Sequence, residues 1–161
     1  MRDLKPYAER CLKKIDALKI RRAKDIQFKI NTRAKTRLGV CKKTGQSYLI
    51  EIASALLDER VPESELENTL LHEILHTCRG CMKHAGKWKQ LADKVNAAYG
   101  CNISRTASKD ALPEELAHKP RYKVVCPNCG AVYERYKRSA LIQHPERYRC
   151  GKCGGRLDAR C

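Results

Sequence analysis

Two histidines four residues apart, with a glutamate directly after the first, are the clearest chemical signal in this chain. His72, Glu73 and His76 form an H-E-x-x-H pattern. Residues four apart lie on the same face of an α-helix, so both imidazoles can bind one metal ion. Glu73 can then take a proton from a water molecule at that metal. The pattern indicates a zinc metallopeptidase; the alternative is that two polar residues meet by chance on a partly exposed helix.

A catalytic zinc ion usually has three protein ligands and one open position, so a third ligand is needed. The remaining histidines are His84, His118 and His144. His84 follows His76 by eight residues and lies beyond a break at Gly80. A chain that turns at Gly80 and doubles back brings His84 to the metal. His84 is therefore the candidate for the third ligand of a catalytic zinc site.

A second metal site is predicted near the end of the sequence. Two C-x-x-C pairs are separated by 20 residues and consist of Cys126, Cys129, Cys150 and Cys153. This spacing is typical of structural zinc sites, in which four thiolates close the coordination shell. Gly130 and Gly154 follow the two pairs, as tight turns at such a site require. The sequence thus predicts two zinc ions, one catalytic and one structural, and two disulfides are the weaker alternative.

Cys78 and Cys81 form a further C-x-x-C pair between the histidine pattern and His84. They could be half of another metal site completed by Cys41 or Cys101, a redox-sensitive pair, or two small side chains packed in a turn. We favour the packing interpretation.

The elements that must position these residues can be read from apolar periodicity. Residues 7–18 have the pattern of an amphipathic helix. Residues 26–32, 38–42 and 48–52 have the pattern of strands, and 43–46 have the composition of a hairpin turn. A central helix begins at Pro62, and its apolar residues indicate that it is buried. His84 opens a further helical pattern that runs to Val95.

The chain is strongly basic, with a formal net charge of +16 and a pI of about 9.6. Such a charge favours binding to polyanions, above all nucleic acid. Aromatic and cationic side chains alternate between the two cysteine pairs, a composition suited to single-stranded DNA. The residues we expect to contact it are Tyr133, Arg135, Tyr136, Lys137 and Arg138. The alternative is that the tyrosines only pack the small domain.

No apolar run approaches the roughly 20 residues that a membrane-spanning helix needs. The sequence starts with charged residues rather than a signal peptide, and its ten cysteines are better read as metal ligands or reduced thiols. We therefore expect a cytoplasmic protein without membrane association.

These motifs, in this order, resemble the SprT-like family of zinc metalloproteases, which includes the DNA-protein crosslink protease Spartan. The resemblance rests on residues 37–41 followed by 48–52, on the H-E-x-x-H pattern, on the segment from His84 to Trp88, and on the four-cysteine ribbon. It implies a zincin-like fold, the zinc ligands His72, His76 and His84, and Glu73 as general base. Ala85 stands where the family usually has glycine.

The expected architecture is α+β. A zincin-like metallopeptidase domain over residues 1–112, with helices and a short antiparallel sheet, precedes a linker over 113–120 and a zinc ribbon over 121–161. The expected function is zinc-dependent hydrolysis of peptide bonds. The resemblance implies that the substrates are DNA-bound or DNA-crosslinked proteins. The alternatives are a non-catalytic nucleic-acid-binding or regulatory zinc protein and a metal-dependent hydrolase acting on another substrate.

Overall fold

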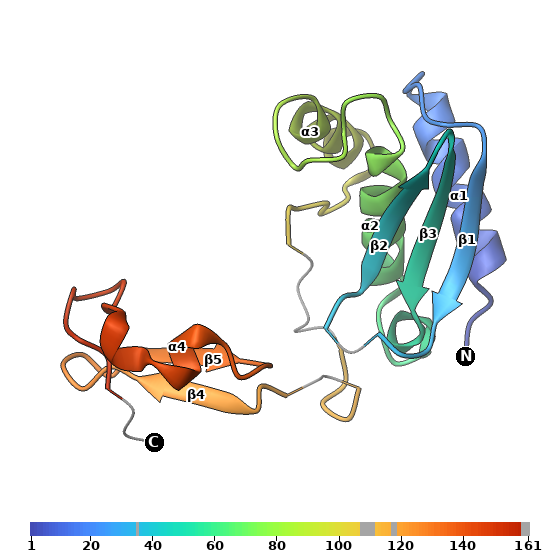
Figure 1. The fold of residues 1–161 in the computed structure, drawn as a ribbon. Coiled ribbons are helices and arrows are strands. Elements are labelled where there is room, and N and C mark those ends of the chain that lie inside the picture. Colours follow the sequence, from blue (N-terminus) through green and yellow to red (C-terminus); the bar gives the residue numbers. More distant parts are fainter. Residues whose placement is uncertain (35, 107–111, 117–118, 159–161) are drawn as a thin grey trace. The chain divides into compact units, whose positions relative to one another are not determined.

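The computed structural model describes residues 1–34, 36–106, 112–116 and 119–158. The chain divides into two compact units, Met1–Ala117 and His118–Cys161 (Figure 1). The division falls within the predicted linker, of which residues 117 and 118 lie outside the described residues. Within the described residues, no helix is both long and apolar enough to cross a membrane.

A three-stranded sheet forms one layer of the first unit. Its strands are β1 (Ile26–Asn31), β2 (Gly39–Thr44) and β3 (Ser47–Ala53), in the order β1-β3-β2. β2 and β3 form an antiparallel hairpin that turns at Gly45, whose φ is 62°. β1, however, pairs with β3 in parallel. The prediction of an antiparallel sheet is therefore wrong for this pairing, and the sheet is mixed.

The parallel pairing follows from the path of the chain between β1 and β2. β3 occupies the centre, and its Tyr48, Ile50 and Ile52 side chains are all buried. Leu38, just before β2, lies at the end of β3, where its carbonyl accepts from the Ala53 N–H (2.8 Å). A connection of seven residues can span the about 10 Å between the two outer strands. β1 and β2 can therefore be consecutive in sequence without pairing.

Two helices, α1 (Leu4–Ala17) and α2 (Glu63–His76), pack against one face of the sheet (Figure 1). The Asp3 side chain caps α1 by accepting from the Lys5 N–H (3.1 Å). A short 3₁₀ helix, η1 (Ser54–Leu57), leads from β3 towards α2. Five apolar side chains of α2 are fully buried: Leu66, Leu70, Leu71, Ile74 and Leu75. The predicted burial of the central helix is confirmed.

A charged contact fixes α2 against α1. Glu67 accepts from Arg10 Nε (2.7 Å) and from Lys14 Nζ (2.6 Å), both on α1. The Glu67 side chain is only 15% exposed, so two cationic partners satisfy a carboxylate that is largely removed from water. This contact restricts the rotation of α2, the helix that carries His72 and His76, about its own axis.

A turn separates α2 from α3 (Lys87–Tyr99). Gly80 (φ 82°) and Gly86 (φ 52°) adopt left-handed φ values that glycine permits. The predicted helix at His84 starts three residues later, at Lys87, so His84 lies in the turn. Of the neighbours Ala85 and Gly86, only Gly86 has a positive φ, so only that position requires glycine. Alanine at position 85, where the family usually has glycine, is therefore compatible with the turn.

The second unit is small. Strands β4 (Tyr122–Val125) and β5 (Val132–Arg135) form an antiparallel pair, followed by the short helices α4 (Ala140–Gln143) and η2 (Pro145–Arg147). Its core consists of Val124, Leu141 and Leu157 packed with Cys126 and Cys150. A core of this size seldom stabilises a fold of about 40 residues without a bound metal or disulfides.

Candidate metal centres

The three histidines predicted as ligands converge on one point. Their Nε2 atoms are separated by 3.2 Å (His72 and His76), 3.0 Å (His76 and His84) and 2.8 Å (His84 and His72). Tetrahedral zinc with bonds of about 2.0–2.1 Å needs ligand nitrogens about 3.3 Å apart. The spacing and the all-imidazole donor set therefore fit zinc. His118 lies outside the described residues.

Backbone carbonyls set the tautomer of two of these rings. His72 Nδ1 contacts the Ser104 carbonyl oxygen at 2.9 Å, and His76 Nδ1 contacts the Cys81 carbonyl oxygen at 2.6 Å. A carbonyl only accepts, so each Nδ1 must carry the proton, which leaves the Nε2 lone pair free for a metal. Burial, followed by the neighbouring imidazoles, lowers the pKa of His72 to about 4. These rings are therefore neutral at pH 7, as ligands must be.

Trp88 packs against all three imidazoles from the first turn of α3. Its ring centroid lies 4.8 Å from that of His72, 5.6 Å from that of His76 and 4.8 Å from that of His84. The side chain is 2% exposed, so it excludes water from one side of the ligand cluster. It also limits the rotation of the three rings.

Glu73 lies beside the histidine cluster and is 6% exposed. Burial raises the pKa of its carboxyl to about 7, and a hydrogen bond from the Cys41 backbone N–H partly opposes this shift. Within the described residues β2 pairs only with β3, so some of its N–H groups point away from the sheet and are available to such partners. A buried carboxyl with a pKa near neutrality suits a group that both takes and returns a proton.

Gly39 on β2 makes room for this glutamate. A Cβ built at Gly39 would lie 2.7 Å from Glu73 Oε1, 2.8 Å from Glu73 Cγ and 2.8 Å from Thr69 Cγ2. Real Cβ atoms essentially never approach other atoms so closely. Glycine is therefore required here by the closeness of strand and helix.

A cleft of about 500 Å³ opens over the histidines and Glu73. The N-terminal part of β2 lines one side, and residues 102–106 line another.

The four predicted cysteine ligands also converge, in the second unit. All four Sγ atoms lie within 4.8 Å of one another, with 3.6 Å between Cys126 and Cys153 and 3.5 Å between Cys129 and Cys150. These distances exceed the about 2.05 Å of a disulfide and approach the about 3.8 Å between sulfurs on tetrahedral zinc. Gly130 and Gly154 each donate an N–H to the first cysteine carbonyl of their pair and have positive φ. The donor set fits a closed structural zinc site.

Tyr133, predicted to contact nucleic acid, contacts the cysteine site. Its hydroxyl lies 3.1 Å from Cys150 Sγ and accepts from the Gly151 N–H (2.8 Å). With the Gly151 N–H as its donor, the hydroxyl is free to donate its own proton to the sulfur. This hydrogen bond is the main reason that the pKa of the Cys150 thiol is lowered to about 6. Sequence reasoning missed this role because β5, which carries Tyr133 between the cysteine pairs, was not predicted.

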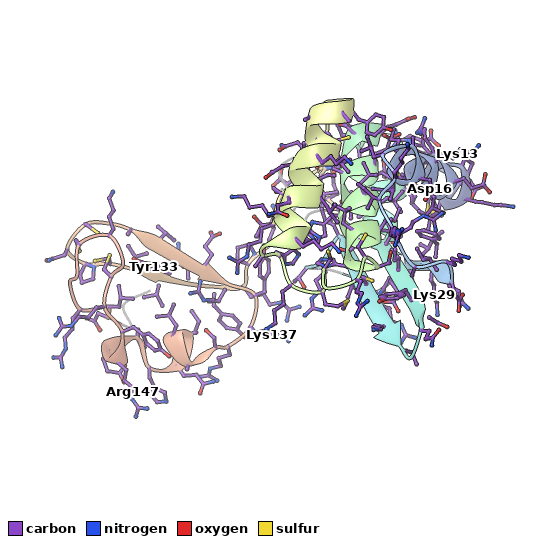
Figure 2. The ribbon with its side chains drawn as sticks, turned by 90° about the horizontal axis from the view of Figure 1, so that it is seen from above. Lys13, Asp16, Lys29, Tyr133, Lys137 and Arg147 are labelled. Carbon is purple, nitrogen blue, oxygen red and sulfur yellow. The ribbon has the colours of Figure 1, made fainter. Side chains whose placement is uncertain are left out.

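The other predicted nucleic-acid residues lie on or just after β5. Arg135, Lys137 and Arg138 are exposed, and Tyr136 is half-buried. Arg147 in η2 also projects from this unit, whereas the labelled Lys13 and Lys29 belong to α1 and β1 of the first unit (Figure 2).

Cys78 and Cys81 are buried in the core of the first unit. Among the residues that the structure describes, neither belongs to a group of metal-ligating side chains. Their surroundings favour the packing interpretation. The carbonyl of Cys81 has a further role as the partner of His76 Nδ1.

Comparison with known proteins agrees with this geometry. The sequence model of the SprT-like family matches residues 8–107, more than half of the chain. The curated protein named "Protein SprT-like" from Bacillus subtilis (strain 168) is 31% identical over 126 residues, which cover 72% of this chain and 75% of that protein. Its namesake from Bacillus velezensis is 30% identical over 125 residues, with 72% and 76% covered. The chain belongs to the SprT-like family.

Proposed function

We propose that this protein is a zinc metallopeptidase that hydrolyses peptide bonds in the cleft of its first unit. The observation that carries this proposal is the convergence of three imidazole Nε2 atoms beside a buried carboxyl. A site that only stabilises the fold has no need of a glutamate at this position. Membership of the SprT-like family supports the same conclusion.

His72, His76 and His84 would hold the zinc ion, and Glu73 would be the general base. Zinc bound there would supply Lewis-acid activation of a water molecule and of the scissile carbonyl. Glu73 takes the proton of the attacking water and later donates it to the leaving amine. The Cys41 N–H holds the carboxyl group in place through both transfers.

The test replaces Glu73 with glutamine, which has nearly the same shape but cannot accept the proton. Zinc content should stay at two ions per chain, while cleavage of a protein substrate should fall by at least about 100-fold. Equal cleavage by the wild type and by zinc-loaded Glu73→Gln would contradict the proposal. A single zinc ion per chain in the wild type would mean that one of the two sites does not bind zinc.

DNA-bound or DNA-crosslinked proteins are the substrates that we propose. The net charge of +16 favours association with nucleic acid, and the second unit exposes Arg135, Lys137 and Arg138 close together in sequence. In this proposal, the four-cysteine unit binds single-stranded DNA and brings the peptidase unit to proteins on that DNA.

The experiment measures cleavage of a DNA-binding protein with and without single-stranded DNA, with Glu73→Gln as control. Cleavage that needs both DNA and Glu73 supports the whole proposal. Cleavage that DNA does not affect supports the peptidase activity and contradicts the proposed targeting by DNA. Tight DNA binding without cleavage under either condition favours a non-catalytic nucleic-acid-binding protein.

The DNA contacts have their own test. Replacing Arg135, Lys137 and Arg138 together by glutamine should weaken DNA binding and reduce the slope of log affinity against log salt by about 2, at about 0.7 per phosphate contact on single strands. The matched control replaces Lys13 and Lys29, two lysines of the first unit that lie on α1 and β1 (Figure 2). If the variant without Arg135, Lys137 and Arg138 binds DNA with unchanged affinity, these residues do not form the DNA-binding surface.

A further inference from the structure

The segment Cys101–Thr106, which we call the wall segment, follows α3 without regular secondary structure of its own. It lines the cleft and supplies the Ser104 carbonyl that contacts His72 Nδ1 at 2.9 Å. An irregular segment is not held by a helix or sheet ladder, so side chains must hold it if that carbonyl is to stay in place.

Asn96, in the last turn of α3, makes two hydrogen bonds to the backbone of one residue of the wall segment, Ile103. Its Oδ1 accepts from the Ile103 N–H (2.8 Å), and its Nδ2 donates to the Ile103 carbonyl (3.0 Å). An amide that makes both bonds to one residue reproduces the pairing of a β-ladder and fixes the plane of the peptide group that follows. That peptide group joins Ile103 to Ser104.

Two other contacts hold the same segment. Asn68, one turn before His72 on α2, accepts from the Asn102 N–H (3.0 Å) through its Oδ1. The Ile103 side chain is 5% exposed and belongs to the core of the unit. Asn96 is the only one of these residues that binds both the N–H and the carbonyl of its partner among the described contacts.

We propose that Asn96 is a positioning residue of the histidine metal centre, which holds the Ser104 carbonyl against His72 and thereby keeps the His72 Nε2 lone pair free for the metal. The chain of contacts runs from the Asn96 amide to the Ile103 backbone, then to the Ser104 carbonyl and to His72 Nδ1. His76 does not depend on this chain because its partner is the Cys81 carbonyl. The inference rests on the metal site of the proposed function but not on proteolysis.

The size of the effect follows from what the hydrogen-bond partner of a metal-binding imidazole contributes. Loss of such a partner typically weakens metal affinity by about 10-fold to 100-fold, because the imidazole is free to rotate and to change tautomer. We expect this loss at the histidine site of Asn96→Ala and of Asn96→Asp. Aspartate keeps the acceptor for the Ile103 N–H but places a carboxylate against the Ile103 carbonyl, so the nearly isosteric variant tests the amide donor itself.

The experiment measures zinc affinity of the full chain by competition with a chelator of graded strength. The four-cysteine site in the second unit is the internal reference, because a cobalt ion bound by thiolates absorbs at wavelengths that an imidazole site lacks. The matched control is Asn31→Ala. Like Asn96, Asn31 uses both ends of its amide: it donates to the Glu51 carboxylate (2.9 Å) and accepts from the Arg33 N–H (3.0 Å). Asn31→Ala should leave both metal affinities unchanged.

Nitrogen NMR of histidine in the metal-free protein gives a readout that general destabilisation does not move. In Asn96→Asp, His72 should become a mixture of tautomers, while His76 keeps its proton on Nδ1. A variant in which both rings change together, or in which histidine-site affinity stays within about twofold of the wild type, would overturn the proposal. Loss of proteolysis alone would bear on the proposed function and leave this inference untouched.

Discussion

Alanine at position 39 should slow catalysis while leaving the metal bound. The added Cβ would lie 2.7 Å from Glu73 Oε1 and 2.8 Å from Thr69 Cγ2. Ordinary contacts to carbon need about 3.5–4.0 Å, so something must move by about 1 Å. The neighbours are a helix with a fully buried apolar side and a strand paired in the sheet, and the Glu73 side chain is the group that can yield.

The expected loss can be estimated from this displacement. Moving a catalytic group by about 1 Å typically reduces turnover by about 100-fold. Overpacking of a tight contact should also lower the free energy of unfolding by about 1–3 kcal/mol. The φ of Gly39 is not in the left-handed region, so the effect is steric and not a matter of backbone strain.

The assay compares Gly39→Ala with Gly45→Ala at equal zinc content, using initial rates on an unfolded protein substrate. Gly45 has a φ of 62° and nothing within 4 Å of a built Cβ, so alanine there should cost about 1 kcal/mol of stability without touching the site. The Cys41 amide proton shift in Gly39→Ala reports the hydrogen bond to Glu73 independently of turnover. Full turnover with an unchanged Cys41 shift would refute the packing argument.

Three further predictions concern the two metal sites and the C-x-x-C turn. Trp88 is the single tryptophan, so removal of zinc from the histidine site should change the intrinsic fluorescence, and unchanged emission would contradict its contact with the ligands. Tyr133→Phe should weaken zinc binding at the cysteine site by about 10-fold, whereas Tyr136→Phe should not, as measured by chelator competition. Replacing both Cys78 and Cys81 by serine should lower the free energy of unfolding, measured in urea, by about 1–3 kcal/mol more than replacing both by alanine. The reason is that a buried hydroxyl needs a hydrogen-bond partner. Equal losses of stability in the two variants would argue against simple packing.

The metal ligands could be predicted from the sequence because their chemistry is local. The spacing of His72 and His76 and of the two cysteine pairs reflects the geometry of a helix and of tight turns, which short windows of sequence encode. His84 required only a turn at Gly80, which the structure contains. The helices and strands were recognised for the same reason, since their periodicity is a local property.

Features that depend on distant parts of the chain could not be read in this way. The parallel pairing of β1 with β3 depends on a seven-residue crossing that has no sequence signature. The carbonyls of Ser104 and Cys81 act through the backbone, which every residue carries, so no residue type marks them. Tyr133 was assigned to nucleic acid from composition, and only the position of Gly151 beside its hydroxyl reveals the contact with the cysteine site.

Ser104 follows His72 by 32 residues, so its carbonyl becomes available late in the synthesis of the first unit. His72 and His76 leave the ribosome well before the residue that fixes the His72 proton, and the intervening chain includes all of α3. A nascent chain that has exposed both histidines still lacks the partner that frees His72 Nε2 for a metal. The three histidines and the Ser104 carbonyl can therefore come together only after nearly all the described residues of the first unit have been synthesised.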